Sequence, residues 1–211
     1  MSHRLITRVF VRLAVVAGMA VSAGGAYAAG VAVMVTDAGG APVADAIVYA
    51  DVVGGPAPHL AHKPAAIEQK GRRFLPMVTV VQTGTEISFP NNDSVRHHVY
   101  SFSPAKVFEL KLYSGTPGSP VMFDKPGPVV VGCNIHDQMV AFIHVVDTPY
   151  FAHTDATGKA QLDNVPPGKY NLKLWYYKTP SPAQIQEQPL LMKAADATAT
   201  IKVIAKPAAE N

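Results

Sequence analysis

Short β-prone segments separated by turn residues constrain the fold of this chain more than any other feature. Sixteen Gly and eighteen Pro are spread along the 211 residues, so turns are frequent. Runs rich in Val, Ile, Tyr, Phe and Thr lie between them, at 31–35, 46–52, 78–81, 86–89, 98–102, 129–131, 139–146, 170–177 and 197–204. Only 183–192 has a weak helical pattern. The sequence therefore predicts an all-β protein built of sandwiches.

The first 28 residues have the organisation of a secretory signal. Arg4, Arg8 and Arg12 precede an apolar stretch, 13–23, that is too short to span a bilayer, and Ala-Tyr-Ala ends the segment as a cleavage site. An uncleaved anchor is the alternative, but small residues interrupt the apolar stretch. The three Arg equal the formal net charge of +3, so the remainder has no cationic excess indicating nucleic-acid binding. We expect a periplasmic protein that is cleaved near Ala28 and not stably inserted in the membrane.

One cysteine and its neighbours carry the strongest chemical signal. Cys133, His136 and Met139 stand at the spacing C-x2-H-x2-M, and Cys133 is the only cysteine in the chain. A thiolate, an imidazole and a thioether form a soft ligand set that suits copper better than zinc, calcium or magnesium. The pair His97 and His98 supplies a further imidazole upstream. Two His, one Cys and one Met are the ligands of a blue-copper electron-transfer centre.

An unpaired cysteine in an exported chain has other interpretations. Exported proteins usually pair their cysteines, so a single one is reactive, bound to a ligand such as a metal ion, or joined to a second molecule by an intermolecular disulfide. It can also be a small buried core residue. A His three residues on and a Met six residues on favour the metal interpretation.

A longer block, from about residue 68 to 146, carries a family pattern. It contains Phe74-Leu75-Pro76, Gly84, Ile87-Ser88-Phe89, the pattern N-x5-H from Asn91 to His97, and Phe123-Asp124-Lys125-Pro126-Gly127 ahead of Cys133. These residues resemble the cupredoxins plastocyanin and amicyanin, and C-x2-H-x2-M is the spacing of the short amicyanin loop. The resemblance implies a Greek-key β-sandwich with one type 1 copper per chain, bound by His97, Cys133, His136 and Met139. It also implies that His136 passes the electron and that Met139 is the weak axial ligand.

The adjacent residues His97 and His98 are both candidates for the upstream ligand. Neighbours in a strand point to opposite faces, so only one of them can face the site. Alignment with plastocyanin-like sequences makes His97 the ligand and places His98 where that family has an Asn that ties the ligand loops together. Asp137 departs from the amicyanin loop, and its negative charge near the metal should lower the reduction potential.

The segments on either side of this block share turn motifs. The first contains Asp37-Ala38-Gly39-Gly40-Ala41-Pro42-Val43, and the second contains Thr154-Asp155-Ala156-Thr157-Gly158 and Val165-Pro166-Pro167-Gly168-Lys169-Tyr170. Together they resemble the prealbumin-like, or carboxypeptidase-regulatory-like, sandwich modules. Roughly 100 residues separate the halves, more than a loop needs, so we predict a copper domain inserted into such a module. Sandwich pieces packed in series are the alternative. The predicted divisions are a signal peptide at 1–28, the first strands of the prealbumin-like module at 29–60, the copper domain at 65–148, the remainder of the module at 149–206 and a tail at 207–211.

Electron transfer competes with three other functional classes. Copper storage or delivery usually relies on clustered Met and His, whereas the Met residues here are scattered. Copper oxidases and nitrite reductases add further copper held by His-x-His pairs, which this sequence lacks, so we do not expect an enzyme. A binding role of the prealbumin-like module stays open. We expect a carrier of single electrons between periplasmic redox proteins such as a dehydrogenase or a cytochrome.

Overall fold

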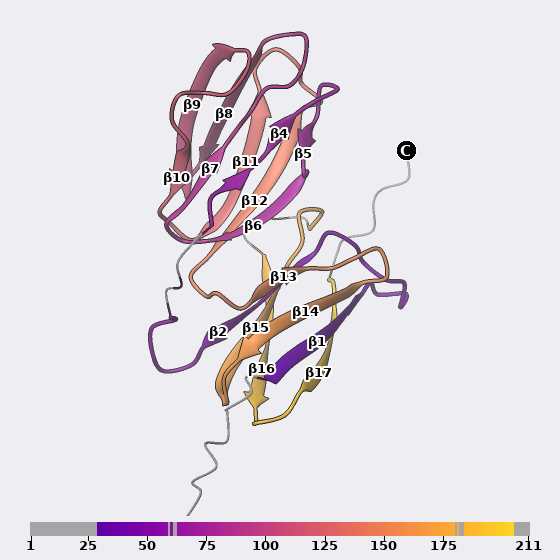
Figure 1. The fold of residues 1–211 in the computed structure, drawn as a ribbon. Helices are drawn as coiled ribbons and strands as arrows, with labels where there is room; N and C mark the ends of the chain where they lie inside the picture. The colour runs from indigo at the N-terminus through magenta and orange to yellow at the C-terminus, as the bar shows by residue number, and fades with distance from the viewer. Residues whose placement is uncertain (1–28, 59, 61–62, 180, 182–183, 205–211) are drawn as a thin grey trace, which may run out of the picture.

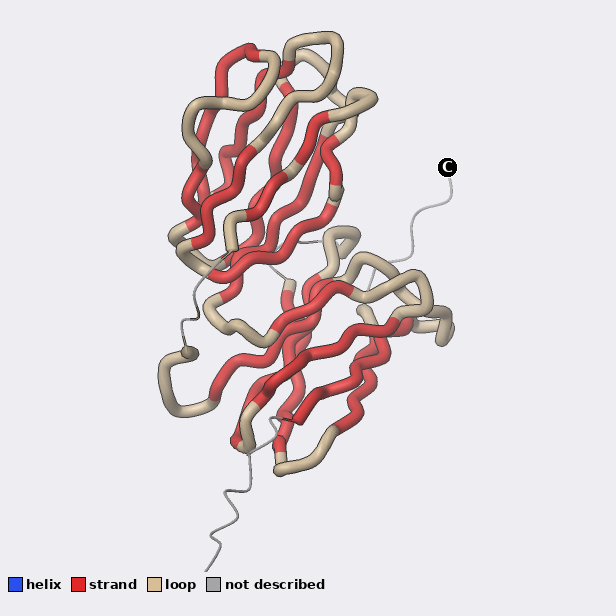
Figure 2. Tube along the Cα trace, viewed as in Figure 1, coloured by secondary structure: helices blue, strands red, loops and turns tan. Residues whose placement is uncertain are grey.

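The computed structural model describes residues 29–58, 60, 63–179, 181 and 184–204. Every regular element in this part of the chain is a strand, which confirms the predicted all-β class (Figures 1 and 2). Accordingly, the described residues contain no helix with the length and apolar character needed to cross a membrane. The predicted signal, 1–28, and the predicted tail, 207–211, lie outside the described residues.

The strands pair in two separate sets. We call the set that lies in the middle of the sequence the inner sandwich, and the set formed by both ends the outer sandwich (upper and lower parts of Figure 1). The inner sandwich consists of β3 (Ala65–Ala66), β4 (Glu68–Gln69), β5 (Phe74–Leu75), β6 (Val78–Gln82), β7 (Thr85–Ser88), β8 (His97–Ser103), β9 (Lys106–Tyr113), β10 (Val121–Phe123), β11 (Gly127–Cys133) and β12 (Val140–Val146). The outer sandwich consists of β1 (Ala29–Thr36), β2 (Ile47–Val52), β13 (Phe151–His153), β14 (Lys159–Val165), β15 (Gly168–Trp175), β16 (Ile185–Met192) and β17 (Ala197–Lys202).

The inner sandwich has a five-stranded sheet, in the order β6-β12-β11-β8-β9, and a three-stranded sheet, β10-β7-β3, with β4 and β5 as a separate hairpin. Strand alternation sends Val129, Val131 and Cys133 of β11 into the core, while Val130 is exposed on the other face. Large apolar side chains such as Phe89 fill the rest of that core. The alternation of β11 is therefore what places the cysteine inside the sandwich.

The outer sandwich packs a sheet of order β14-β1-β17 against one of order β13-β2-β15-β16. Its first strand, β1, lies parallel to its last, β17, with Val31 opposite Ala197. The turn before β14 needs Gly158, whose φ is +75° and where a Cβ atom would lie 2.5 Å from the carbonyl oxygen of Val35. The likeness of this sandwich to prealbumin-like modules, and the predicted division points, stay predictions.

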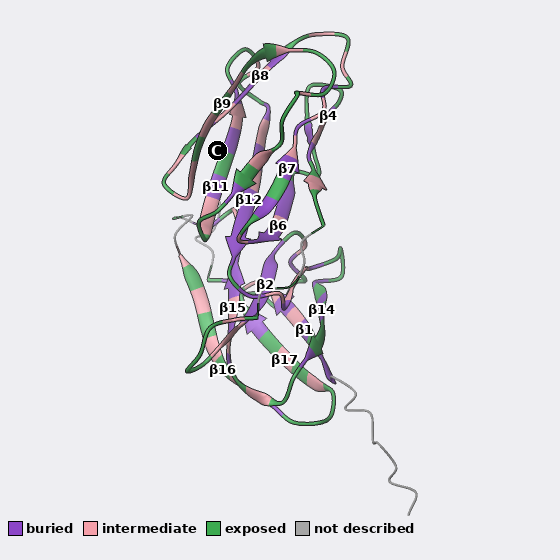
Figure 3. Ribbon diagram, turned by 60° about the vertical axis from the view of Figure 1, so that its left-hand side comes forward, coloured by how far each residue is buried: buried purple, intermediate pink, exposed green. Residues whose placement is uncertain are grey.

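An aromatic contact joins the two sandwiches. The outer face of β6 and β12 is buried where β2 and β15 approach it (Figure 3). His144 of β12 stacks on Trp175 with ring centroids 4.9 Å apart and an interplanar angle of 9°. The Tyr49 ring also contacts His144, with the two ring centroids 5.3 Å apart. Burial lowers the pKa of His144 to about 4, helped by the charge of Lys173. Its Nδ1 has no hydrogen-bond partner among the described residues, which suits a neutral imidazole in an apolar contact.

The weak prediction of a helix at 183–192 is wrong for the described residues of this range. Residues Ile185–Met192 form β16, which pairs along its whole length with β15. Its side chains alternate between exposed and half-buried, as expected of a strand at the edge of a sheet. Pairing with a neighbouring strand has decided the conformation there, rather than local propensity.

Candidate metal centre

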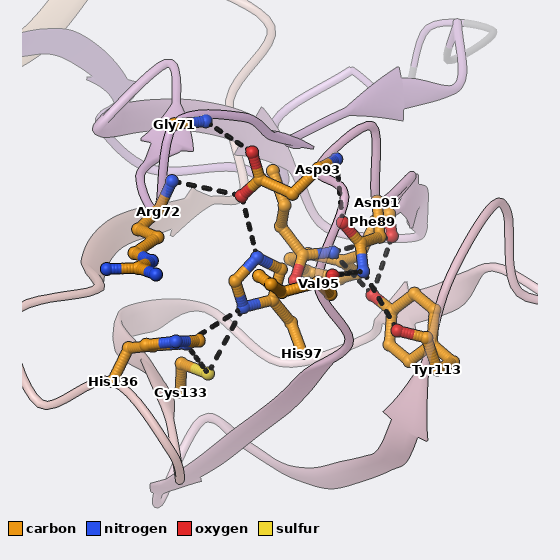
Figure 4. Close-up of polar contacts among 11 residues, drawn as sticks. Gly71, Arg72, Phe89, Asn91, Asp93, Val95, His97, Tyr113, Cys133 and His136 are labelled. Atoms are coloured by element: carbon orange, nitrogen blue, oxygen red, sulfur yellow. Dashed lines mark hydrogen bonds and ion pairs between the residues drawn. The ribbon is translucent and has the colours of Figure 1, made fainter.

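Three potential metal ligands converge at one end of the inner sandwich. His97 begins β8, Cys133 ends β11, and His136 lies in the loop before β12. The Nδ1 atoms of His97 and His136 are 3.1 Å apart, and Cys133 Sγ lies 3.7 Å from the first and 3.8 Å from the second (Figure 4). No other group of three or more His, Cys, Asp or Glu side chains in the described part of the chain is close enough to hold a metal ion.

The triangle formed by these donor atoms has the dimensions of a metal site. The point equidistant from the three atoms lies about 2.1 Å from each, close to the bond lengths that zinc, another divalent transition-metal ion, makes to His nitrogen (about 2.0–2.1 Å) and to Cys sulfur (about 2.3 Å). A thiolate with two imidazoles is also a donor set that copper accepts in trigonal sites. The residues present therefore fit the copper ion that the sequence suggests.

Sheet register brings the upstream histidine to the cysteine. Cys133 lies opposite Val99 in the antiparallel pair β8–β11, so the end of β11 lies beside the start of β8. His97 is fully buried, and Cys133 is buried as well. Two of the three donors are thus fixed on paired strands rather than on mobile loops.

The loop between β11 and β12 is closed by its own backbone. The amide of Met139 donates to the carbonyl oxygen of His136 at 2.9 Å, and the amide of Cys133 donates to the carbonyl oxygen of Met139 at 3.2 Å. These bonds hold His136, which is half-buried, next to Cys133. The Met139 side chain is buried in the same core cluster as Cys133, and its service as an axial ligand stays a prediction.

Asp93 holds His97 from the side away from the donor atoms. Its Oδ2 lies 2.7 Å from Nε2 of His97 and accepts the backbone N–H of Arg72 at 2.9 Å, while Oδ1 accepts that of Gly71 at 2.6 Å (Figure 4). Burial acts to raise the pKa of Asp93, but the hydrogen bonds from Arg72, His97 and Gly71 lower it overall. A carboxylate on the second ring nitrogen orients a ligand histidine and presents Nδ1 to the metal. The sequence prediction missed this residue.

His98 faces away from the cluster, as alternation requires of the residue beside His97. Its Nε2 lies 2.8 Å from Glu109 Oε1 on the opposite face of the sheet. Alignment with the family's Asn suggested that the His98 side chain ties the ligand loops together, but this side chain contacts Glu109 instead. The link to the loop is made by the backbone, because the carbonyl oxygen of His98 accepts the amide of Asn134 at 3.1 Å. The Asn91 side chain secures the segment before His97 by donating to the carbonyl oxygens of Val95 and Tyr113.

Comparison with known proteins gives structural likenesses only. The sequence matches no family model and no curated protein. A copper-containing nitrite reductase from Thermus scotoductus SA-01 is 25% identical over 45% of this chain, with a TM-score of 0.37, and the match spans a quarter of that enzyme's length. A purple cupredoxin from Nitrosopumilus maritimus is 22% identical over 38% of this chain and 98% of its own, with a TM-score of 0.34. The Cu(I) form of an amicyanin variant is 13% identical over 46% of this chain and 97% of its own, with a TM-score of 0.35.

Proposed function

We propose that the protein is an exported, cupredoxin-like carrier of single electrons that binds one copper ion through His97, Cys133 and His136, with Met139 as a weak axial ligand. The observation that carries the proposal is the triangle of two Nδ1 atoms and one Sγ atom with sides of 3.1, 3.7 and 3.8 Å. Bound copper would supply a one-electron couple between its cupric and cuprous states.

The scaffold suits a centre that changes charge with little movement. His97 and Cys133 stand on paired strands of a close-packed core, and Asp93 fixes the His97 ring through its second nitrogen. A donor set held rigidly in one geometry has little to rearrange when an electron arrives. This favours electron transfer over storage or delivery, which requires the ion to enter and leave easily.

His136 is the residue through which electrons would pass. It is half-buried, whereas the other two donors are buried, and its neighbours Ile135 and Asp137 are exposed. A partner that docks at this end of the inner sandwich meets the His136 edge first. The expected partners are periplasmic redox proteins, such as a dehydrogenase or a cytochrome, and we propose no enzymatic activity of the chain itself.

A visible absorption spectrum, recorded while the chain from residue 29 is titrated with cupric ion, tests this function. We expect an intense thiolate-to-copper charge-transfer band that saturates at one copper per chain and bleaches on reduction with ascorbate. A weak, broad ligand-field band would contradict the proposal. Binding of cuprous ion alone would move the protein to the storage and delivery class.

A further inference from the structure

A compact basic turn lies beside the candidate metal centre. Strands β4 and β5 are joined by Lys70, Gly71, Arg72 and Arg73, all four exposed. We call the three cationic residues Lys70, Arg72 and Arg73 the basic tip. The φ angles of Gly71 and Arg72 are +61° and +55°, and residues 70 and 73 exchange two backbone hydrogen bonds of 3.0 and 3.2 Å. This is the geometry of a tight hairpin turn, so the charges are displayed from a defined backbone.

The basic tip is attached to the metal centre through Asp93. The carboxylate that accepts the N–H groups of Gly71 and Arg72 also holds Nε2 of His97. Arg72 and His136 lie on the same side of His97 in Figure 4. The tip is therefore fixed at the end of the sandwich where electrons would enter and leave.

The charges of the tip are not used inside the molecule. Lys70, Arg72 and Arg73 form no ion pair with any described residue. Two acidic side chains lie near the tip: Asp93 as described, and Glu68, whose Oε1 accepts the side-chain amide of Asn92 at 2.8 Å. Their hydrogen-bond donors are neutral or, in the case of His97, a ring that Asp93 orients, so the three cations of the tip face two carboxylates. Three exposed cations that form no ion pair exceed the two neighbouring carboxylates by one charge, so the turn itself presents positive charge to solvent.

We propose that the basic tip, with the exposed side chain of Ile135 in the neighbouring loop, is the docking surface for an acidic redox-partner protein. The proposal rests on the function proposed above, because it names the partner of the same centre. Charge complementarity at such a surface steers encounters and raises association rates, most strongly at low salt. The apolar side chain beside His136 then provides the close contact.

Two small oxidants of opposite charge measure the local potential at the centre. The reduced, copper-loaded protein is mixed with hexacyanoferrate(III), an anion, or with tris(phenanthroline)cobalt(III), a cation, over a range of ionic strength. The test variant combines Lys70→Gln, Arg72→Gln and Arg73→Gln, which keep the backbone N–H groups that Asp93 binds. We expect its hexacyanoferrate rate to fall about 10-fold at low salt, with the salt dependence largely lost, and its cobalt rate not to fall.

A matched control removes the same charge elsewhere. Lys125→Gln, Lys193→Gln and Lys202→Gln change three exposed lysines, one in the turn before β11 and two at or near the ends of β16 and β17. The two triple variants are compared at about 0.1 M ionic strength, where the screening length is about 10 Å, so this control should leave the hexacyanoferrate rate within about twofold of the wild type while the tip variant still lowers it. If both triple variants lower the hexacyanoferrate rate equally, the net charge of the protein explains the rate and the proposed docking surface is overturned.

Poly-L-glutamate, as a model acidic chain, tests the surface without copper. In the metal-free protein, we expect its amide shift changes to centre on Lys70, Arg72, Arg73 and Ile135, and to disappear in the tip variant. Shift changes centred elsewhere would overturn the proposal even if the centre is redox-active. If the copper band is absent and neither oxidant reacts, the proposed function is wrong. If the copper is oxidised at the same rates in the wild type and the tip variant, only the proposed docking surface is wrong.

Discussion

Cys133 supplies the one thiolate of the proposed centre, so its replacement separates copper chemistry from folding. Cys133→Ser removes the sulfur but keeps a small side chain in the buried site at the end of β11. We expect the charge-transfer band of the cupric protein to be lost while the far-UV circular dichroism is unchanged, because the band arises from the thiolate. A variant that keeps the visible band would disprove the assignment of Cys133.

The neighbours His97 and His98 offer a matched pair of substitutions. His97→Ala removes a donor of the triangle and should abolish the visible band, whereas His98→Ala removes contacts with Glu109 and the Tyr100 ring, neither of which belongs to the triangle. An exposed pair of that kind contributes about 1 kcal/mol or less, so the second variant should bind copper with its colour retained. Copper titrations of both variants, followed by visible absorption, test this. Loss of the band in His98→Ala with the band retained in His97→Ala would make His98 the ligand.

Asp93 acts on the metal through His97 and not by direct contact. Asp93→Ala should weaken copper binding by about 10- to 100-fold, because an oriented ligand nitrogen would lose its partner. The control is Asp124→Ala, which removes an exposed carboxylate that pairs with Lys106 at 3.0 Å. Competition with a copper chelator measures both affinities, and the isosteric Asp93→Asn should restore part of the loss if hydrogen bonding to the ring is the cause. Equal affinities of the wild type and Asp93→Ala would remove Asp93 from the site.

Strands β12 and β15 supply the stacked rings at the contact between the two sandwiches, to which β2 and β6 also contribute. Trp175 is almost fully buried and stacks on His144. Trp175→Ala should lower the free energy of unfolding by about 3–5 kcal/mol, the usual cost of truncating a buried aromatic side chain. Urea denaturation measures this loss, with Val130→Ala on the exposed face of β11 as the control. A loss below about 1 kcal/mol would show that the contact is not well packed.

Element prediction from the sequence succeeded where the apolar pattern was strong and failed where pairing partners decide the conformation. The runs around β1, β2, β11 and β12 were recognised from their Val-rich stretches. In contrast, the predicted runs include neither β14, in which Asp163 and Asn164 follow Leu162, nor β9. Their places in the sheets come from β1 and β8, which are distant in sequence or lie across a hairpin.

The candidate site shows the same division. The spacing of Cys133 and His136 lies within one sequence segment, and alignment with plastocyanin-like sequences selects His97. The structure brings the donor atoms of these three residues together, and their binding of a metal stays a prediction. The link from residues 71 and 72 through Asp93 to His97 joins a hairpin turn to a strand more than twenty residues later. No local pattern reports such a contact, because backbone amides of any residue type can make it.

At the scale of the whole molecule, the buried His144 makes stability depend on pH. Its pKa is lowered from 6.5 to about 4 in the folded protein, so the unfolded chain binds the proton more readily. The stabilisation is complete above about pH 6.5 and is lost as the pH falls toward 4, by an amount on the order of 3 kcal/mol. Urea unfolding of the metal-free protein at pH 7 and pH 4.5 measures it. His144→Phe should reduce the difference, and an unchanged difference would assign the effect to other groups.

The pairing of β1 with β17 also determines when each half of the molecule can be completed. The inner sandwich contains all of its strands between residues 65 and 146, so its strand pairing does not depend on β17. The outer sandwich cannot close until residues 197–202 arrive to lie beside Val31 and its neighbours. A chain that stops short of β17 would therefore keep every strand that positions His97, Cys133 and His136 but would lack the last strand of the outer sandwich. Proteolytic trimming at the C-terminus would act first on the outer sandwich and only later on the candidate metal centre.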